Sequence, residues 1–221
     1  MRKILSIIRI TFRQILFPEG ALCLNCGKIS KGSCLCPACR WDLENGEVMD
    51  SWEWRDLDGV KAWSIRPHRG VARQLVLSLK YRAEACAAKE LGSLLRFRPA
   101  VFPVLPAKTK VTWVPMPPKR RQERCIDHGR LLAEIVAREL GLEYRELIMR
   151  RKSGHLQARL NRKGREKNLR DTFAPAEKNN SPVLLVDDVL TTGTTALRCI
   201  EALREGGAKD ITVLTMTWAD N

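Results

Sequence analysis

The stretch that decides the fold lies near the carboxyl end of the chain, where residues 183–195 read VLLVDDVLTTGTT. Pro182 precedes a short apolar run with valine at both ends, over 183–186, which predicts a buried parallel strand. A loop of hydroxyl residues around Gly193 follows and leads into a predicted helix over 194–205. A strand that passes directly into a helix in this way indicates an α/β fold.

The junction between this strand and this helix carries the predicted chemistry. Asp187 and Asp188 stand at the carboxyl end of the strand, where open α/β sheets place their ligands, so we expect both side chains to face solvent. Free N–H groups at a helix N-terminus bind phosphate monoesters, and two adjacent carboxylates suit vicinal hydroxyls. The pattern therefore predicts a sugar-phosphate site, whose phosphate lies against Thr191, Thr192, Gly193, Thr194 and Thr195.

The alternative for this loop is a plain N-capped helix with Thr191 or Thr192 as its cap, but that interpretation leaves two ionised aspartates unexplained. The loop has neither the Gly-Lys-Ser/Thr of a Walker A motif nor the three spaced glycines of a dinucleotide-binding turn. His68, His128 and His155 stand apart from each other and from any evident base. We therefore expect no Cys/His pairing for nucleophilic catalysis.

Five of the eight cysteines fall between positions 23 and 39 and include two Cys-x2-Cys pairs. Four thiolates around one ion suit a structural Zn²⁺, and the predicted ligands are Cys23, Cys26, Cys36 and Cys39. Cys34 can replace Cys36 as a ligand, and the sequence leaves that choice open. Two disulfides in a secreted protein are the alternative, which the lack of a signal peptide disfavours.

Between the motifs, short apolar strands alternate with helical stretches. Strands are expected over 60–65, 111–114, 143–149, 171–173 and 211–215, and helices over 75–79, 83–95 and 129–140, the last ended by Gly141. This alternation predicts a doubly wound, mostly parallel sheet with helices on both faces. We expect an N-terminal helix and zinc-ribbon module over 1–50 and the α/β domain over 51–221.

The composition indicates a soluble, strongly basic protein. Lys and Arg number 39 against 25 Asp and Glu in 221 residues, a net charge of +14 that attracts polyanions at long range. No apolar run reaches the roughly 18 residues that span a bilayer. Residues 1–17 form a predicted amphipathic helix that docks on the core, with a membrane-surface helix as the alternative. We expect the protein to be cytoplasmic.

The Asp-Asp-x-x-Thr-Thr-Gly-x-Thr element resembles the 5-phosphoribosyl-1-pyrophosphate (PRPP) loop of type I phosphoribosyltransferases. Together with the Cys-x2-Cys pairs it resembles the ComF family, a competence-protein group with an N-terminal zinc finger. The resemblance extends over most of the chain. It includes Leu79-Lys80-Tyr81, Val114-Pro115-Met116-Pro117, Gln157, Leu160, Arg165, Asn168 and Phe173.

The resemblance implies a role for each motif. Asp187 and Asp188 would hold the ribose hydroxyls, partly through Mg²⁺, and the threonine loop would hold the 5′-phosphate. The turn after Val114 would bind pyrophosphate, and the basic segment 150–167 resembles a flap that closes over PRPP. The implied pyrophosphate and flap residues are Lys119, Arg120, Arg121, Arg151 and Arg165.

Two departures from the family pattern bear on specificity. Residues 124–128 read Arg-Cys-Ile-Asp-His where the family often carries Arg-Gly-Phe-Asn-Gln. The arginine is kept but the glycine is lost, so the pyrophosphate region departs from the family pattern. Thr191 stands where relatives that act on 6-oxopurines carry an aspartate, so hypoxanthine or guanine salvage is disfavoured.

Two functions remain open at the level of sequence. The first is a Mg²⁺-dependent phosphoribosyltransferase that acts on an unidentified acceptor. The second is a non-catalytic PRPP sensor or single-stranded nucleic-acid-binding module linked to DNA uptake and the competence machinery. The basic flap fits a pyrophosphate clamp or a single-stranded DNA track. The sequence leaves the oligomeric state open.

Overall fold

The computed structural model describes residues 21–30, 32–45, 52–97, 100, 102–117, 120–121, 126–151 and 172–219. The helix predicted over 1–17 lies outside the described residues. So does most of the basic segment that resembles a flap, together with Lys119 and Arg165.

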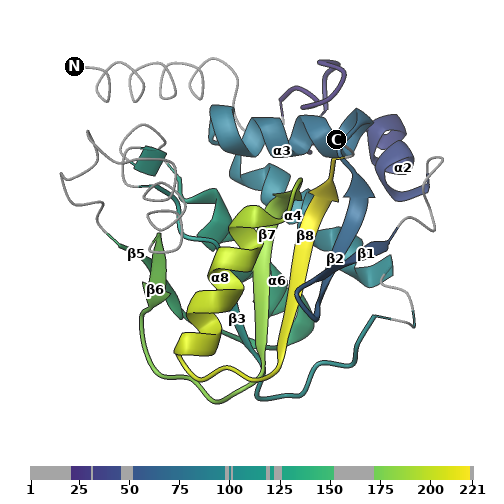
Figure 1. Cartoon of the computed structure of the whole chain (residues 1–221). Helices are drawn as coiled ribbons and strands as arrows, with labels where there is room; N and C mark the ends of the chain where they lie inside the picture. Colours follow the sequence, from purple (N-terminus) through teal and green to yellow (C-terminus); the bar gives the residue numbers. More distant parts are fainter. Residues whose placement is uncertain are drawn as a thin grey trace, which may run out of the picture.

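A six-stranded sheet in the order β1-β2-β8-β7-β3-β4 forms the centre of the structure (Figure 1). Every neighbouring pair in this sheet is parallel except β1 and β2, which form an antiparallel hairpin at one edge. The strands are β1 Glu53–Leu57, β2 Val60–Pro67, β3 Lys110–Trp113, β4 Glu143–Tyr144, β7 Val183–Leu190 and β8 Ile211–Trp218.

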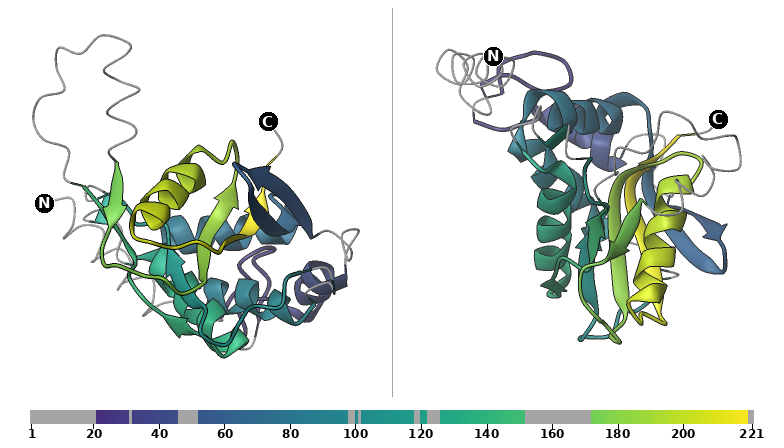
Figure 2. Two further views of the ribbon diagram at one scale, coloured as in Figure 1. Left: turned by 60° about the horizontal axis from the view of Figure 1, so that its bottom comes forward. Right: turned by 60° about the vertical axis from the view of Figure 1, so that its left-hand side comes forward.

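Helices cover both faces of this sheet, because the central strands are apolar on both sides. Leu184 and Val186 of β7 pack with α3 Gly70–Arg82, α4 Ala85–Ser93 and α6 His128–Leu140. Val183 and Leu185 of the same strand pack with α8 Thr194–Glu205 on the opposite face (Figure 2). This arrangement confirms the predicted doubly wound, mostly parallel α/β sheet.

Two strands predicted over 143–149 and 171–173 differ from the structure. The strand expected over 143–149 is divided into β4 and β5 Ile148–Arg150, and β5 pairs with β6 Phe173–Pro175 in a separate antiparallel ribbon. Where the chain leaves the main sheet, the N–H of Leu147 donates to the side-chain hydroxyl of Thr112 on β3 at 3.2 Å and not to a backbone carbonyl. The sequence did not predict β1, α2 Pro37–Asn45 or the 3-10 turn Leu94–Phe97 that extends α4.

The cysteine-rich segment packs against α3 and α4 and shares one hydrophobic cluster with them. Arg40 of α2 lies 2.6 Å from the buried Glu90 of α4, and Arg96 lies 2.8 Å from Glu44. The side chain of Arg66, which is buried, donates to the carbonyls of Leu43 and Glu44 at the end of α2. The separation into domains at residue 50 stays a prediction. No helix in the described ranges is both long and apolar enough to cross a membrane.

The contact between α4 and α6 depends on Gly92. A Cβ at this position would overlap the Cγ2 methyl of Ile135. We therefore predict that Gly92→Ala destabilises the protein by about 1–3 kcal/mol from overpacking, although alanine favours a helix by about 1 kcal/mol over glycine. Chemical denaturation of Gly92→Ala in the wild-type and Ile135→Ala backgrounds tests this, because the loss should shrink when the methyl is absent. An equal loss in both backgrounds would contradict the packing argument.

Candidate functional site

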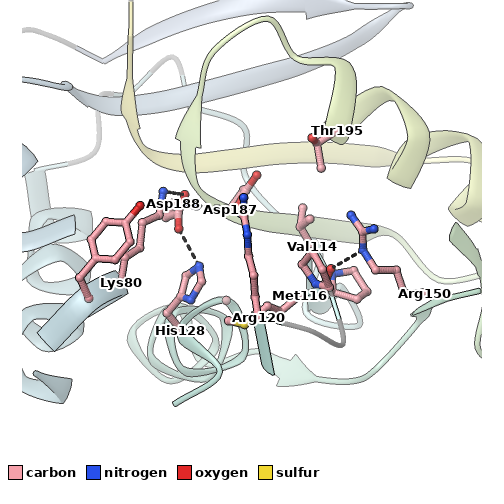
Figure 3. A pocket seen from close by; sticks show the side chains of 13 residues that line it. Lys80, Val114, Met116, Arg120, His128, Arg150, Asp187, Asp188 and Thr195 are labelled. Carbon is pink, nitrogen blue, oxygen red and sulfur yellow. Dashed lines mark hydrogen bonds and ion pairs between the residues drawn. The ribbon is translucent and has the colours of Figure 1, made fainter. Parts of the chain in front are cut away.

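A pocket of about 210 Å³ lies beside the carboxyl-terminal half of β7 and the segment after β3, where α3, α6 and α8 converge (Figure 3). Both predicted aspartates line it, together with one residue of the threonine loop and several cations. The lining residues are Lys80, Tyr81, Val114, Pro115, Met116, Pro117, Arg120, His128, Gly129, Arg150, Asp187, Asp188 and Thr195.

Asp188 does not face solvent as the sequence analysis expected. Its side chain is buried, with Lys80 Nζ at 2.8 Å and His128 Nε2 at 2.9 Å from its two carboxylate oxygens. The expectation failed because β7 continues past the aspartates to Leu190 and pairs with β8 along that length. Side chains alternate along a strand, so Asp188 points to the face of Leu184 and Val186, where α3 and α6 lie.

Asp187 points to the opposite side of β7 and is partly exposed. Its Oδ1 accepts a hydrogen bond of 2.9 Å from the N–H of Asp188. Burial of its carboxylate, and then the charge of Asp188, raise the pKa of Asp187 to about 7. The pKa values of the two neighbouring carboxyl groups are thus shifted in opposite directions, because the contacts with His128 and Lys80 lower the pKa of Asp188 in spite of its burial.

Nothing in the sequence indicated that His128 belongs to the pocket, since the three histidines were expected to stand apart from each other and from any evident base. It begins α6, and the Asp127 side chain caps this helix by accepting from the N–H of Arg130 at 3.2 Å. Gly129 lets the helix approach the end of β3, because a Cβ there would lie 3.2 Å from the Val114 carbonyl. The sequence signal for the pocket was Leu79-Lys80-Tyr81, which carried no assigned role.

A second layer of hydrogen bonds supports β7 beside the pocket. The Thr217 hydroxyl donates to the Asp188 carbonyl at 3.1 Å, and His68 Nδ1 lies 2.9 Å from the same hydroxyl. Burial, together with the charges of Lys80 and Arg73, lowers the pKa of His68. These contacts connect β2 and β8 to the strand that carries the aspartates.

The threonine loop lies at the N-terminus of α8, as the sequence predicted. Gly193 precedes the helix with φ of +75°, and a Cβ on it would lie 2.6 Å from Leu57 Cδ2, so both backbone conformation and space favour glycine. Thr195 lines the pocket, whereas Thr191, Thr192, Gly193 and Thr194 flank it. Gly193 is the N-cap of α8 and no side chain caps this helix, so the alternative of Thr191 or Thr192 as the cap is wrong; the Thr192 hydroxyl accepts only a long hydrogen bond of 3.4 Å from the N–H of Thr194.

The predicted cations separate into two groups. Arg120 lines the pocket, but Arg121 lies 3.0 Å from Asp127, and Arg151 lies 3.8 Å from Glu205 at the far end of α8. Arg150, the last residue of β5, also lines the pocket, where its Nε donates to the Pro115 carbonyl at 3.2 Å. Among the described residues, the pocket therefore has two guanidinium groups.

The four predicted zinc ligands converge on one point. The sulfur atoms of Cys23, Cys26, Cys36 and Cys39 all lie within 4.8 Å of one another. The Cys26 and Cys36 sulfurs are 3.7 Å apart, close to the edge of about 3.8 Å in a tetrahedron with Zn–S bonds of about 2.3 Å. Cys34 is bonded to Cys86 of α4 instead, so Cys36 is the residue of the two that joins the cluster.

The thiols of this cluster are in an environment that favours metal binding. Burial opposes ionisation of Cys23, but N–H groups of Cys26, Cys36 and Asn25 lower its pKa to about 6. Burial, together with the neighbouring thiols, raises the pKa of Cys39 to about 12. A divalent cation would stabilise the thiolate form of the whole set. The donor set therefore fits Zn²⁺.

The raised pKa of Asp187 generates a stability prediction. The folded protein holds a proton on Asp187 that the unfolded chain releases near pH 4, so folding loses stability as the pH rises from about 4 to about 7. We expect Asp187→Asn, which cannot ionise, to melt a few degrees above the wild type at pH 8 and close to it at pH 4.5. Scanning calorimetry at both pH values measures this.

Asp188→Asn is the matched control for that experiment. It removes the partner of Lys80 and His128, so it should cost about 1–3 kcal/mol of stability at pH 8. If Asp187→Asn melts below the wild type at pH 8, the claim that burial and the neighbouring charge disfavour an ionised Asp187 is wrong.

The zinc site generates a second prediction. Cys36→Ser should lower the zinc content from about one ion per chain to well below that, because it removes one of four ligands. Cys34→Ser, two residues away, should keep the ion, because Cys34 is bonded to Cys86. Elemental analysis of the purified variants distinguishes them, and loss of zinc from Cys34→Ser alone would contradict the ligand assignment.

Comparison with known proteins agrees with this geometry. Residues 125–220 match the family model of the phosphoribosyl transferase domain. The chain is 34% identical over 105 residues to competence protein F of Haemophilus influenzae, an alignment that covers 45% of this chain and 46% of that protein. The chain thus matches about half the length of this curated relative.

Solved structures of enzymes that use phosphoribosyl groups are also similar. Glutamine PRPP amidotransferase from Bacillus subtilis, complexed with ADP and GMP, is 22% identical with a TM-score of 0.41, covering 80% of this chain and 30% of that one. Adenine phosphoribosyltransferase from Leishmania tarentolae is 14% identical with a TM-score of 0.34, covering 78% and 85%. At these TM-scores the likeness carries no argument. Residues 125–220 are thus similar to the phosphoribosyl transferase domain, and part of the chain is similar to competence protein F, in agreement with the resemblance that the sequence indicated.

Proposed function

We propose that the chain binds PRPP together with Mg²⁺ and transfers the phosphoribosyl group to an acceptor. The observation that carries this proposal is the pocket itself, in which Asp187 lies beside the N-terminus of α8 and Thr195. A ribose 5-phosphate needs a carboxylate that accepts from its hydroxyls and a helix N-terminus that binds its phosphate, and this pocket contains both.

The 5′-phosphate would bind at the start of α8. The first N–H groups of a helix have no partner within the helix, and they carry a partial positive charge that favours an anion. Thr192, Thr194 and Thr195 are exposed and offer hydroxyl donors beside these groups. Gly193 would bring the backbone close to the phosphate.

The ribose hydroxyls and Mg²⁺ would bind at the aspartates. Mg²⁺ commonly uses one or two carboxylates together with substrate oxygens, and Asp187 and Asp188 supply such a donor set. The raised pKa of Asp187 fits a cation as well, because a positive charge nearby would remove the repulsion that disfavours its ionised form. When bound, Mg²⁺ would neutralise charge on the pyrophosphate leaving group.

The pyrophosphate would lie toward Arg120 and Arg150. Its departure leaves positive charge on the anomeric carbon and negative charge on the leaving group, so cations at one end and a carboxylate at the other lower the barrier. Lys119, Arg121, Arg151 and Arg165 remain candidates for the same role, as the family resemblance implies. The walls formed by Val114 and Met116 would keep water from the reacting carbon.

The similarity to competence protein F supports a role in natural competence and DNA uptake as the second part of the proposal. The net charge of +14 is compatible with contact to a polyanion. A non-catalytic PRPP sensor or a single-stranded DNA-binding module is the alternative outcome, and binding experiments separate it from an enzyme.

Calorimetric titration with PRPP and Mg²⁺ tests the proposal. We expect saturable binding by the wild type and a loss of about 100-fold in affinity for Asp187→Asn, because one charge-assisted contact is worth about 1.5–3 kcal/mol. The exposed Glu143→Gln, on β4 and outside the pocket, is the control and should bind like the wild type.

Two outcomes would redirect the assignment. Equal PRPP affinity in the wild type and Asp187→Asn would contradict the site. Absence of PRPP binding, with tight and salt-sensitive binding of single-stranded DNA, would replace the enzyme with a nucleic-acid-binding protein.

A further inference from the structure

The two adjacent aspartates of the pocket are held in different ways. Asp188 has a close neighbour at each carboxylate oxygen: Lys80 Nζ lies 2.8 Å from Oδ1, and His128 Nε2 lies 2.9 Å from Oδ2, where the contact does not have the geometry of a hydrogen bond (Figure 3). The Asp187 carboxylate accepts a hydrogen bond from the Asp188 N–H, and it has no ion-pair partner within the described residues. The pair therefore contains one engaged carboxylate and one that is open to a ligand.

The partners of Asp188 come from rigid elements on one face of the sheet. Lys80 lies in the last turn of α3, and His128 is the first residue of α6, where the Asp127 cap and the close approach at Gly129 fix its position. Both side chains are mostly buried. Asp188 is thus held between two helices that pack on the same face of β7.

Displacement of Asp188 would also turn Asp187. The N–H of Asp188 donates to Asp187 Oδ1 at 2.9 Å, and the Asp188 carbonyl accepts from Thr217 at 3.1 Å. Side-chain contacts on Asp188 and backbone contacts on the same residue therefore determine where the Asp187 carboxylate points. An open carboxylate with a fixed direction is preorganised for its ligand.

We propose that His128 is a positioning residue, which together with Lys80 holds Asp188 as a fixed negative charge and thereby orients the neighbouring Asp187 toward the sugar phosphate. This role rests on the proposed function, because the ligand it serves is PRPP. Asp188 Oδ2 is buried without a hydrogen-bond partner among the described residues, so the role requires at position 128 an N–H that can turn toward this oxygen.

Two substitutions at this position separate positioning from simple packing. His128→Gln keeps an N–H donor of similar reach, whereas His128→Leu fills the space without a donor. Calorimetry with PRPP and Mg²⁺ should give an affinity within about twofold of the wild type for His128→Gln and about tenfold weaker for His128→Leu. Glu134→Leu, on the exposed face of the same helix, is the matched control and should bind like the wild type.

A spectroscopic measurement on the free protein tests the contact without PRPP. The Nε2 proton of His128 should give a slowly exchanging, downfield resonance in ¹H NMR that disappears in His128→Gln. Thermal melting checks that each variant is folded, and His128→Ala replaces His128→Leu if that variant does not fold.

The outcomes separate the two claims. Binding of PRPP by the wild type with equal affinity in His128→Leu, or absence of the resonance, would overturn the positioning role alone. Failure of the wild type to bind PRPP would overturn the proposed function, and the role of His128 in it, even where the resonance shows that the contact exists.

Discussion

The ion pair of Asp188 with Lys80, supported by His128, is the interaction on which the arrangement of the pocket depends. It joins the strand that carries both aspartates to α3 and α6, which come from distant parts of the chain. A buried carboxylate is costly unless it is paired, so these two helices must stay close to β7. The same arrangement gives the other carboxylate of the pocket, Asp187, a defined direction and a raised pKa.

The cysteine-rich segment contributes to the same wall of the pocket. Cys34 is bonded to Cys86 in the first turn of α4, five residues after Tyr81, and the Arg40–Glu90 contact joins α2 to the same helix. The four-thiol cluster orders the loop from which these contacts start. The N-terminal segment therefore packs as part of the core that supports α3 and α4, and α3 presents Lys80 to the site.

Local patterns in the sequence predicted those parts of the fold that depend on local physics. The bounds of α8, the αL glycine that ends α6 and the convergence of four cysteines all follow from spacing and backbone preference. The sequence did not reveal that β7 continues to Leu190, because Asp187 and Asp188 interrupt its apolar run and only pairing with β8 extends it. Nor could it show that Lys80 and His128 meet at Asp188, or that Cys34 pairs with Cys86 across 52 residues, since these contacts arise from the packing of distant elements.

The most direct test of the central claim, that this pocket receives a sugar phosphate, is a crystal structure of the chain with PRPP and Mg²⁺. Our account predicts the 5′-phosphate at the N-terminus of α8 beside Thr195, and the ribose within hydrogen-bond distance of Asp187. It also predicts that Asp188 keeps both of its contacts with Lys80 and His128. Electron density for PRPP at another surface, or a phosphate bound away from α8, would contradict it.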